Sequence, residues 1–144
     1  MSVKQISVFL ENKAGSMLGM TSTLAAHNID MRALSLAETS DFGIVRVIVD
    51  DVYEASTVLK DAGFIYNVAS VVCVCIPDEP GGLNKALQVL SEENLNVEYL
   101  YAVMGGAGSE HAYTILRVQD YDAAEAALKS HGLMVVDQDH ISNL

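Results

Sequence analysis

The sequence contains the same pattern twice, and this internal repeat limits the possible folds more than any other feature. Residues 3–68 align with residues 69–137. The matching blocks, in the same order in both copies, are Val8–Met17 with Val74–Leu83, Asn28–Met31 with Asn94–Val97, Ile44–Val47 with Ile115–Val118, and Leu59, Lys60 and Gly63 with Leu128, Lys129 and Gly132. Four blocks in one order indicate a duplicated domain. We therefore predict two domains, 1–69 and 70–144.

Each copy predicts the same succession of strands and helices. Ile6, Val8 and Leu10 alternate with other residues, which indicates a half-buried strand. A turn, an amphipathic helix, two strands, a second helix that ends at a glycine and a last strand follow. The later strands are expected at 31–37, 42–49 and 64–69 in the first copy and at 97–103, 112–118 and 133–137 in the second. This order predicts an α+β fold, a ferredoxin-like βαββαβ sandwich duplicated in tandem.

The chain is both apolar and acidic. Hydrophobic residues make up 51% of its 144 residues, and 19 Asp and Glu against 8 Lys and Arg give a net charge of −11. A negative field repels phosphate groups, so we predict no nucleic-acid partner and no membrane partner. Cys73 and Cys75, one residue apart on a strand, have poor disulfide geometry, and the first residues lack a signal-peptide pattern. We expect a cytoplasmic protein with reduced cysteines.

No arrangement of residues favours catalysis. The four histidines lack a partner at a catalytic or metal-ligand spacing that both copies share. A metal site needs three or more convergent ligands, so we predict no metal and no cofactor. The glycine-rich segment 105–109 matches neither phosphate-loop pattern, and we interpret it as a hairpin loop. The sequence therefore predicts a protein that is not an enzyme.

The turn after the first strand of each copy remains as the candidate binding site. Its residues are Asn12, Lys13, Ala14, Gly15, Ser16 and Met17 in the first copy and Asp78, Glu79, Pro80, Gly81, Gly82 and Leu83 in the second. Glycine lets the backbone approach a ligand closely, and the N–H groups at a helix N-terminus attract a carboxylate. The side chain of Asn12 or Asp78 can hold an ammonium group; its other expected role is to cap the helix. The turns therefore suit a small zwitterion.

The two copies resemble a known family. The pattern [Asn/Asp]-x-[Pro/Ala]-Gly-x-[Leu/Met], then an amphipathic helix, then Asn-[Ile/Leu]-[Asp/Asn]-[Met/Val] at the opening of a strand, is similar to the ACT domain. The resemblance implies a regulatory module that binds an amino acid between two paired domains, where the turn of one faces the start of strand two of the other. It implies that the residues opening the second strands join the site: Asn28, Ile29, Asn94 and Leu95. Ala14 departs from the usual proline, so the two sites need not be equal.

The chain resembles a stand-alone tandem ACT protein. We expect a non-catalytic regulatory module that binds a free amino acid, forms a homodimer and acts on a separate amino-acid biosynthetic enzyme. The alternative is a regulatory or structural subunit that works through a protein-partner surface and keeps a vestigial ligand site. A small ferredoxin-like enzyme is a third hypothesis, which lacks an acid–base pair shared by both copies. Acidic residues near the turns favour a ligand with a polar or cationic side chain; they are Glu11, Asp30, Asp78 and Glu79.

Overall fold

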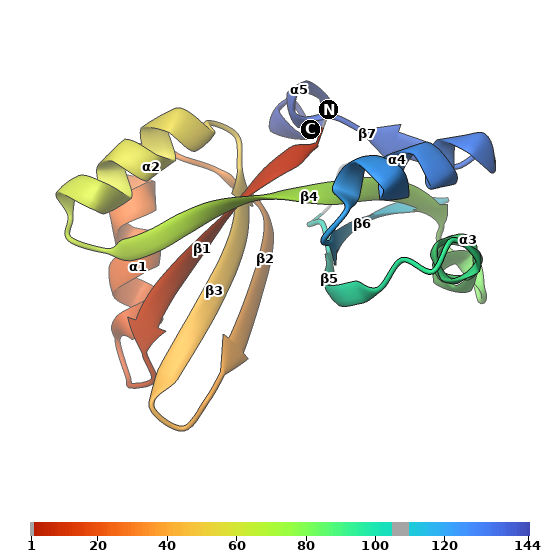
Figure 1. Cartoon of the computed structure of the whole chain (residues 1–144). Coiled ribbons are helices and arrows are strands. Elements are labelled where there is room, and N and C mark those ends of the chain that lie inside the picture. Colours follow the sequence, from red (N-terminus) through yellow and green to blue (C-terminus); the bar gives the residue numbers. More distant parts are fainter. Residues whose placement is uncertain (1, 105–109) are drawn as a thin grey trace. The chain divides into compact units, whose positions relative to one another are not determined.

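The chain divides into two compact units, which we call the first and the second repeat (Figure 1). The first repeat is Lys4–Ala69, and the second is Ser70–Leu144 together with Met1–Val3. A computed structural model describes residues 2–104 and 110–144. The glycine-rich segment 105–109, interpreted above as a hairpin loop, lies outside these residues.

The first repeat is a sheet with two helices on one face. Its elements are β1 (Val3–Glu11), α1 (Ser16–Ala26), β2 (Met31–Glu38), β3 (Phe42–Val49), α2 (Val52–Asp61) and the first part of β4 (Ile65–Pro77). The strand order is β2-β3-β1-β4, and β3 pairs antiparallel with both β1 and β2. Ile6, Val8 and Leu10 of β1 pack with the helices in one core, as their alternation predicts.

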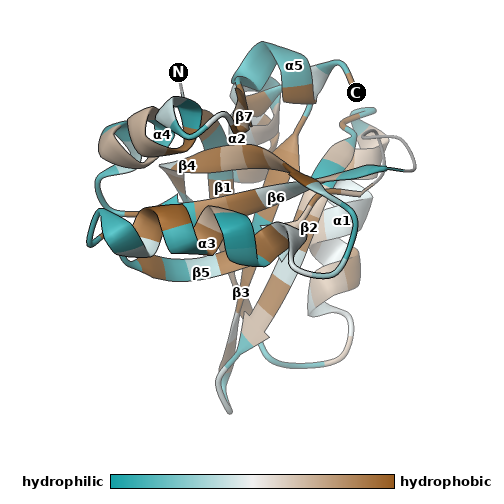
Figure 2. Ribbon diagram, turned by 90° about the vertical axis from the view of Figure 1, so that its right-hand side faces the viewer, coloured by the Kyte–Doolittle hydropathy of each residue, from teal (hydrophilic) through white to brown (hydrophobic). Residues whose placement is uncertain are grey.

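The second repeat has the same architecture. After β4 come α3 (Gly82–Glu92), β5 (Val97–Ala102), β6 (His111–Val118), α4 (Tyr121–Ser130), β7 (Met134–Val136) and a short α5 (Gln138–Ser142). The strand order is β5-β6-β4-β7, with antiparallel pairing throughout. Figure 2 shows the alternating brown and teal stripes of an amphipathic helix on α3, and its apolar side includes Ala86, Val89 and Leu90 of the second core. The βαββαβ fold, repeated twice, is confirmed.

The strand register corrects one block of the sequence alignment. Val47 pairs with Ile6 in the first repeat, and Leu116 pairs with Val72, the equivalent of Ile6, in the second. Val47 is therefore equivalent to Leu116, whereas the sequence alignment placed it on Val118. A shift of two residues keeps every side chain on the same face of the sheet, so the apolar pattern cannot reveal it.

The helix α5 has no counterpart in the first repeat. Asp137 caps it by accepting a hydrogen bond from the His140 N–H at 2.9 Å. Ile141 of this helix is fully buried, and the His140 ring lies edge-on to Tyr113, with Nε2 2.9 Å from the Tyr113 hydroxyl. The contacts of His140 and the burial of Ile141 therefore hold α5, whose other residues are polar, in place.

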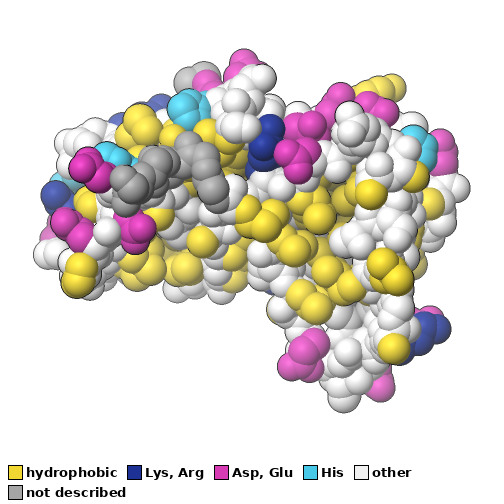
Figure 3. All heavy atoms as spheres, turned by 180° about the vertical axis from the view of Figure 1, so that it is seen from behind, with side chains coloured by type: hydrophobic (Ala, Val, Ile, Leu, Met, Phe, Trp, Pro, Cys, Tyr) yellow, Lys and Arg dark blue, Asp and Glu magenta, His cyan; other side chains and the backbone are white. Residues whose placement is uncertain are grey.

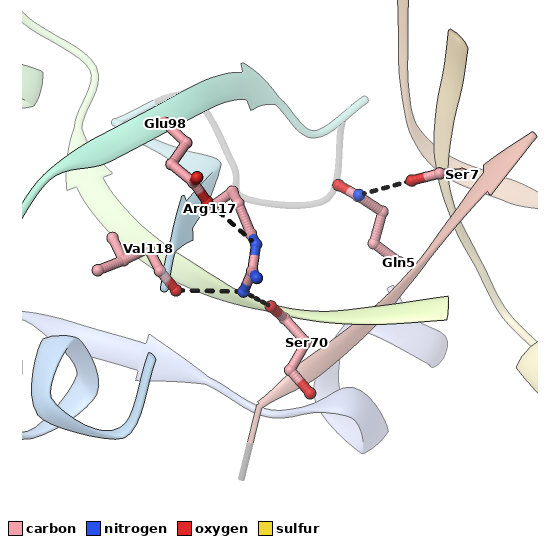
Figure 4. Close-up of polar contacts among 6 residues, drawn as sticks. All are labelled: Gln5, Ser7, Ser70, Glu98, Arg117 and Val118. Atoms are coloured by element: carbon pink, nitrogen blue, oxygen red, sulfur yellow. Dashed lines mark hydrogen bonds and ion pairs between the residues drawn. The ribbon is translucent and has the colours of Figure 1, made fainter. Parts of the chain in front are cut away.

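Polar side chains on the strands of each repeat form hydrogen bonds and an ion pair, some within one strand and some between strands (Figure 4). The Arg117 guanidinium donates to the backbone carbonyls of Ser70 at 3.0 Å and Val118 at 3.2 Å, and it lies 3.4 Å from the Glu98 carboxylate. In the first repeat the buried Gln5 amide donates to the Ser7 hydroxyl at 3.1 Å. These bonds satisfy polar groups that strand positions leave half-buried or buried. Among the described residues, no helix is long and apolar enough to cross a membrane.

Candidate functional site

Both candidate turns end in a glycine that begins a helix. Gly15 is the N-cap of α1 with a φ of 89°, and Gly81 is the N-cap of α3 with a φ of 86°. This left-handed conformation favours glycine, because a Cβ crowds the neighbouring carbonyl there. Because each N-cap residue is a glycine, neither helix has an N-cap side chain that accepts a hydrogen bond from its first turn. The helix N-termini in these turns are therefore formed by backbone alone.

The other long helices of the two repeats begin differently. The carboxylate of Asp51 accepts a hydrogen bond from the Glu54 N–H at 3.0 Å at the start of α2. Asp120 accepts one from the Ala123 N–H at 3.1 Å at the start of α4. A carboxylate thus already sits at the N-termini of α2 and α4, as helix capping favours. Of the helices α1 to α4, only α1 and α3 lack an N-cap side chain, and these are the two helices that follow the turns of the ACT pattern.

Asn12 has a structural role that the sequence analysis did not predict. Its side-chain amide donates to the Thr39 carbonyl at 2.9 Å, and its backbone N–H donates to the Asp41 carbonyl at 2.9 Å. It therefore ties the turn to the β2–β3 hairpin. The expectation that Asn12 or Asp78 caps its helix is wrong, because the N-caps are the glycines.

At the second turn the helix backbone lies very close to the end of the preceding strand. A Cβ built on Gly82, the buried first residue of α3, would overlap the backbone carbonyl oxygen of Pro77. Ser16 occupies the equivalent place in the first repeat and is half-buried. The helix α3 therefore approaches the end of β4 more closely than a side chain at Gly82 would permit.

The remaining turn residues divide between solvent and core. Lys13 forms an exposed ion pair with Glu11 at 3.1 Å. Ala14, Glu79 and Pro80 are exposed as well. Met17 and Leu83 are partly buried and pack against the first and the second core. The two apolar residues that close the pattern thus anchor the helices.

The asparagines that open the second strands end the preceding helices. Asn28 and Asn94 have φ values of 56° and 57°. The Asn28 N–H donates to Ala25 at 3.0 Å and the next N–H donates to Leu24 at 3.1 Å, which is a Schellman motif; Asn94 forms the same pair of bonds. Asparagine adopts the left-handed conformation more readily than other side chains do, so helix termination alone explains this residue type.

Within one repeat, the turn and the strand-opening asparagine lie at opposite ends of a helix. The helix α1 has 11 residues, which corresponds to a length of roughly 16 Å. Ile29 is buried in the first core, and Leu95 packs partly buried against the second. The structure therefore does not bring the two halves of the expected site together inside a single repeat.

A cavity of about 490 Å³ adjoins the first turn. It is lined by Phe9, Leu10, Glu11, Lys13, Gly15, Ser16, Gly19, Phe42, Gly63, Phe64 and Ile65, all in the first repeat. In the second repeat, cavities of about 270 and 360 Å³ share the residues around Asn94 and Leu95. The sequence analysis missed the phenylalanines of the first cavity. The sequence feature that could have indicated this cavity is Phe9, an apolar residue on the strand face opposite to Val8 and Leu10.

In the described part of the chain, no group of three or more His, Cys, Asp or Glu side chains could hold a metal ion. Both cysteines are free. Burial, and secondarily the neighbouring Cys75, raise the pKa of the Cys73 thiol to about 12. Burial raises the pKa of Tyr113 as well, with smaller contributions from the two thiols. Groups shifted in this direction stay protonated at neutral pH and are poor nucleophiles.

Comparison with known proteins identifies the family. The family model described as an ACT domain pair matches residues 1–144. The crystal structure of protein BT0572 from Bacteroides thetaiotaomicron is 37% identical, covers 100% of this chain and 98% of that chain, and superposes with a TM-score of 0.92.

More distant structures share the fold. The regulatory subunit of aspartate kinase from Thermus thermophilus is 17% identical, with a TM-score of 0.67 over 92% of this chain and 94% of that one. The equivalent subunit from Thermus flavus is 16% identical, with a TM-score of 0.63 over 90% and 92%. No curated protein matches the sequence. The chain belongs to the ACT domain family, as an ACT domain pair.

Proposed function

We propose that this ACT domain pair is a non-catalytic regulatory module that binds a free amino acid at a β1–α1-type turn. The observation that carries the proposal is the contrast between helix starts. The helices α1 and α3 begin at a positive-φ glycine with no side-chain cap, whereas α2 and α4 begin with an Asp carboxylate in place. The N–H groups of Ser16 and Gly82 donate to the Lys13 and Glu79 carbonyls of their own turns. An incoming α-carboxylate would accept hydrogen bonds from the N–H groups that follow them in the first helical turn, and it would gain from the positive end of the helix dipole.

The ammonium group of the ligand needs an acceptor beside the turn. The amide nitrogen of Asn12 donates to Thr39, which directs the side chain and leaves its carbonyl oxygen as the acceptor for an ammonium. Asp78 would supply a carboxylate at the equivalent position of the second turn. The two turns are therefore proposed as two related but unequal sites.

A second ACT domain would complete each site. Because α1 separates the turn from Asn28, the strand-opening segment in contact with a ligand comes from another domain. We propose 1–69 and 70–144 as the paired domains, and a homodimer as the assembled form. The ligand would then stabilise domain pairing, which is how binding becomes a regulatory signal.

The target is proposed to be a separate enzyme of amino-acid metabolism in the cytoplasm. Two Thermus proteins with this fold are regulatory subunits of an enzyme, as their names state. Two free cysteines suit a reducing compartment. This chain would act in the same manner, as a regulatory protein distinct from the catalytic chain.

The alternative function is a subunit with a vestigial ligand site. One observation favours it: several residues of the ACT pattern have a structural purpose that needs no ligand. Asn28 and Asn94 end helices, and Met17 and Leu83 pack against the cores. Ligand-dependent stabilisation distinguishes the two functions.

The test is a thermal melt of ligand-free protein with each of the twenty amino acids. At 100 times its Kd, a ligand adds about 2.7 kcal/mol to the free energy of unfolding, which raises the Tm by roughly 2–6 °C. We expect at least one amino acid to do this, and its decarboxylated amine to fail, since the amine leaves the turn N–H groups unpaired. No response to any amino acid would favour the alternative.

A pair of glycine variants then locates the site. Gly15→Val introduces a side chain at a φ of 89° beside the candidate site, and Gly132→Val introduces the same strain at a φ of 80° at the end of α4. Both lose stability, but only Gly15→Val is expected to lose the part of the ligand response that comes from the first turn. If the ligand raises the Tm of Gly15→Val as much as that of Gly132→Val, the first turn does not bind the ligand.

A further inference from the structure

The cavity at the first turn is mainly apolar, and this feature identifies the class of ligand. We propose that it binds the side chain of an aromatic amino acid of about the size of phenylalanine, one per chain, in the first repeat. The inference rests on the proposed function and adds the specificity of the site. The volume of about 490 Å³ lies in the range of roughly 300–1,000 Å³ that is usual for small-molecule sites.

The lining separates into an apolar and a polar part. Five of its eleven residues are large and apolar: Phe9, Leu10, Phe42, Phe64 and Ile65. The polar side chains are those of Glu11, Lys13 and Ser16, at or next to the turn where the helix N–H groups lie. An amphipathic ligand matches this division, with its charged end at the turn and its apolar end against the strands.

Three of the apolar residues are exposed to an unusual degree. Phe9 is 41% exposed, Phe42 61% and Ile65 72%. Glu11 of β1 pairs directly with Phe42 of β3, so Phe9, two residues earlier, lies diagonally across from Phe42 on the same face. Figure 3 shows hydrophobic side chains at the surface above the protruding β2–β3 hairpin. A ligand ring covering these side chains removes apolar surface from water.

The acidic side chains of the first repeat do not favour a cationic ligand. Glu11 is paired with Lys13 at 3.1 Å, and Asp30 is paired with Arg32 at 3.0 Å. Each acidic side chain of this repeat that suggested a polar or cationic ligand is thus neutralised by a neighbour. The remaining selectivity comes from the apolar walls.

The second repeat has no phenylalanine at the equivalent positions. Cys75 replaces Phe9, and by the strand register His111 replaces Phe42. Leu133 and Met134 stand where the first repeat has Phe64 and Ile65. The same ring would therefore find no phenylalanine wall there, which is why we infer one aromatic ligand per chain.

The experiment is calorimetric titration of the full chain with L-phenylalanine, compared with L-alanine, L-aspartate, L-lysine and phenethylamine. We expect L-phenylalanine to bind with one site per chain and more tightly than the other four compounds. Phe42→Ala is expected to raise its Kd about tenfold or more, because a ring–ring contact and buried area are lost. The matched control is Tyr53→Ala, an 84% exposed aromatic residue on α2 outside the cavity, which should leave the Kd unchanged.

The outcomes separate this inference from the proposed function. Binding of L-aspartate or L-lysine in preference, with a Kd that Phe42→Ala does not change, would overturn the aromatic specificity and keep amino-acid binding. Phenethylamine binding as tightly as L-phenylalanine would overturn recognition of the carboxylate. A protein that binds none of the twenty amino acids would overturn the inference and the proposed function together.

Discussion

Replacing either of two adjacent glycines by alanine should reduce stability for two different reasons. Gly81 has a φ of 86° and open space where a Cβ would lie. The cost of Gly81→Ala is therefore backbone strain of about 1–2 kcal/mol, offset by about 0.4–1 kcal/mol because alanine restricts the unfolded chain. We expect a net loss of about 1 kcal/mol.

Gly82 presents the opposite case. It begins the helix α3 with no positive φ, so helix propensity alone predicts that alanine stabilises it by up to about 1 kcal/mol. The added Cβ would however overlap the Pro77 carbonyl oxygen, a backbone atom that cannot rotate away. Either β4 or α3 must shift, and overpacking of this kind costs about 1–3 kcal/mol or more. We expect Gly82→Ala to lose about 3 kcal/mol, more than Gly81→Ala.

Urea unfolding of ligand-free protein, followed by circular dichroism, measures both losses as shifts of the midpoint at constant slope. Gly19→Ala is the control: Gly19 lies inside α1 with open space around its Cβ position, so this variant should gain about 0.5–1 kcal/mol. A Gly82→Ala protein as stable as the parent, or more stable than Gly81→Ala, would refute the argument from close approach.

Two further predictions concern titration and capping. The pKa of Cys73 is raised to about 12, against 9.0 for the free thiol, so between these values the folded chain keeps a proton that the unfolded chain loses. The free energy of unfolding should therefore fall between about pH 9 and 12. Cys73→Ala should remove part of that fall, measured as the difference between urea midpoints at pH 8 and pH 10.5. Asp120→Ala should cost about 1 kcal/mol in the same assay, because the Ala123 N–H loses its cap. Asp78 precedes a helix that uses no side-chain cap, so the free energy of unfolding of Asp78→Ala should stay within about 0.5 kcal/mol of the parent value. Equal losses of stability in Asp120→Ala and Asp78→Ala would contradict the difference between the two helix starts.

The sequence by itself determined the repeated fold. Strand alternation such as Ile6, Val8 and Leu10, helical spacing and the doubled order of elements are local patterns, and each must bury one apolar face in any stable structure. The helix-ending role of Gly63 and Gly132 was also readable, and their φ values of 85° and 80° confirm it.

The tertiary structure alone decided the register and the composition of the candidate site. Val47 pairs with Ile6, and the equivalent residue in the second repeat is Leu116, because a two-residue slip leaves the apolar pattern unchanged and only hydrogen-bonded pairing selects one register. The Asn12 amide meets Thr39 across 27 residues of chain. The cavity likewise combines side chains from β1, α1, β3 and β4, which only folding brings together. Such contacts depend on distances between segments far apart in the chain, and no local pattern of residues encodes those distances.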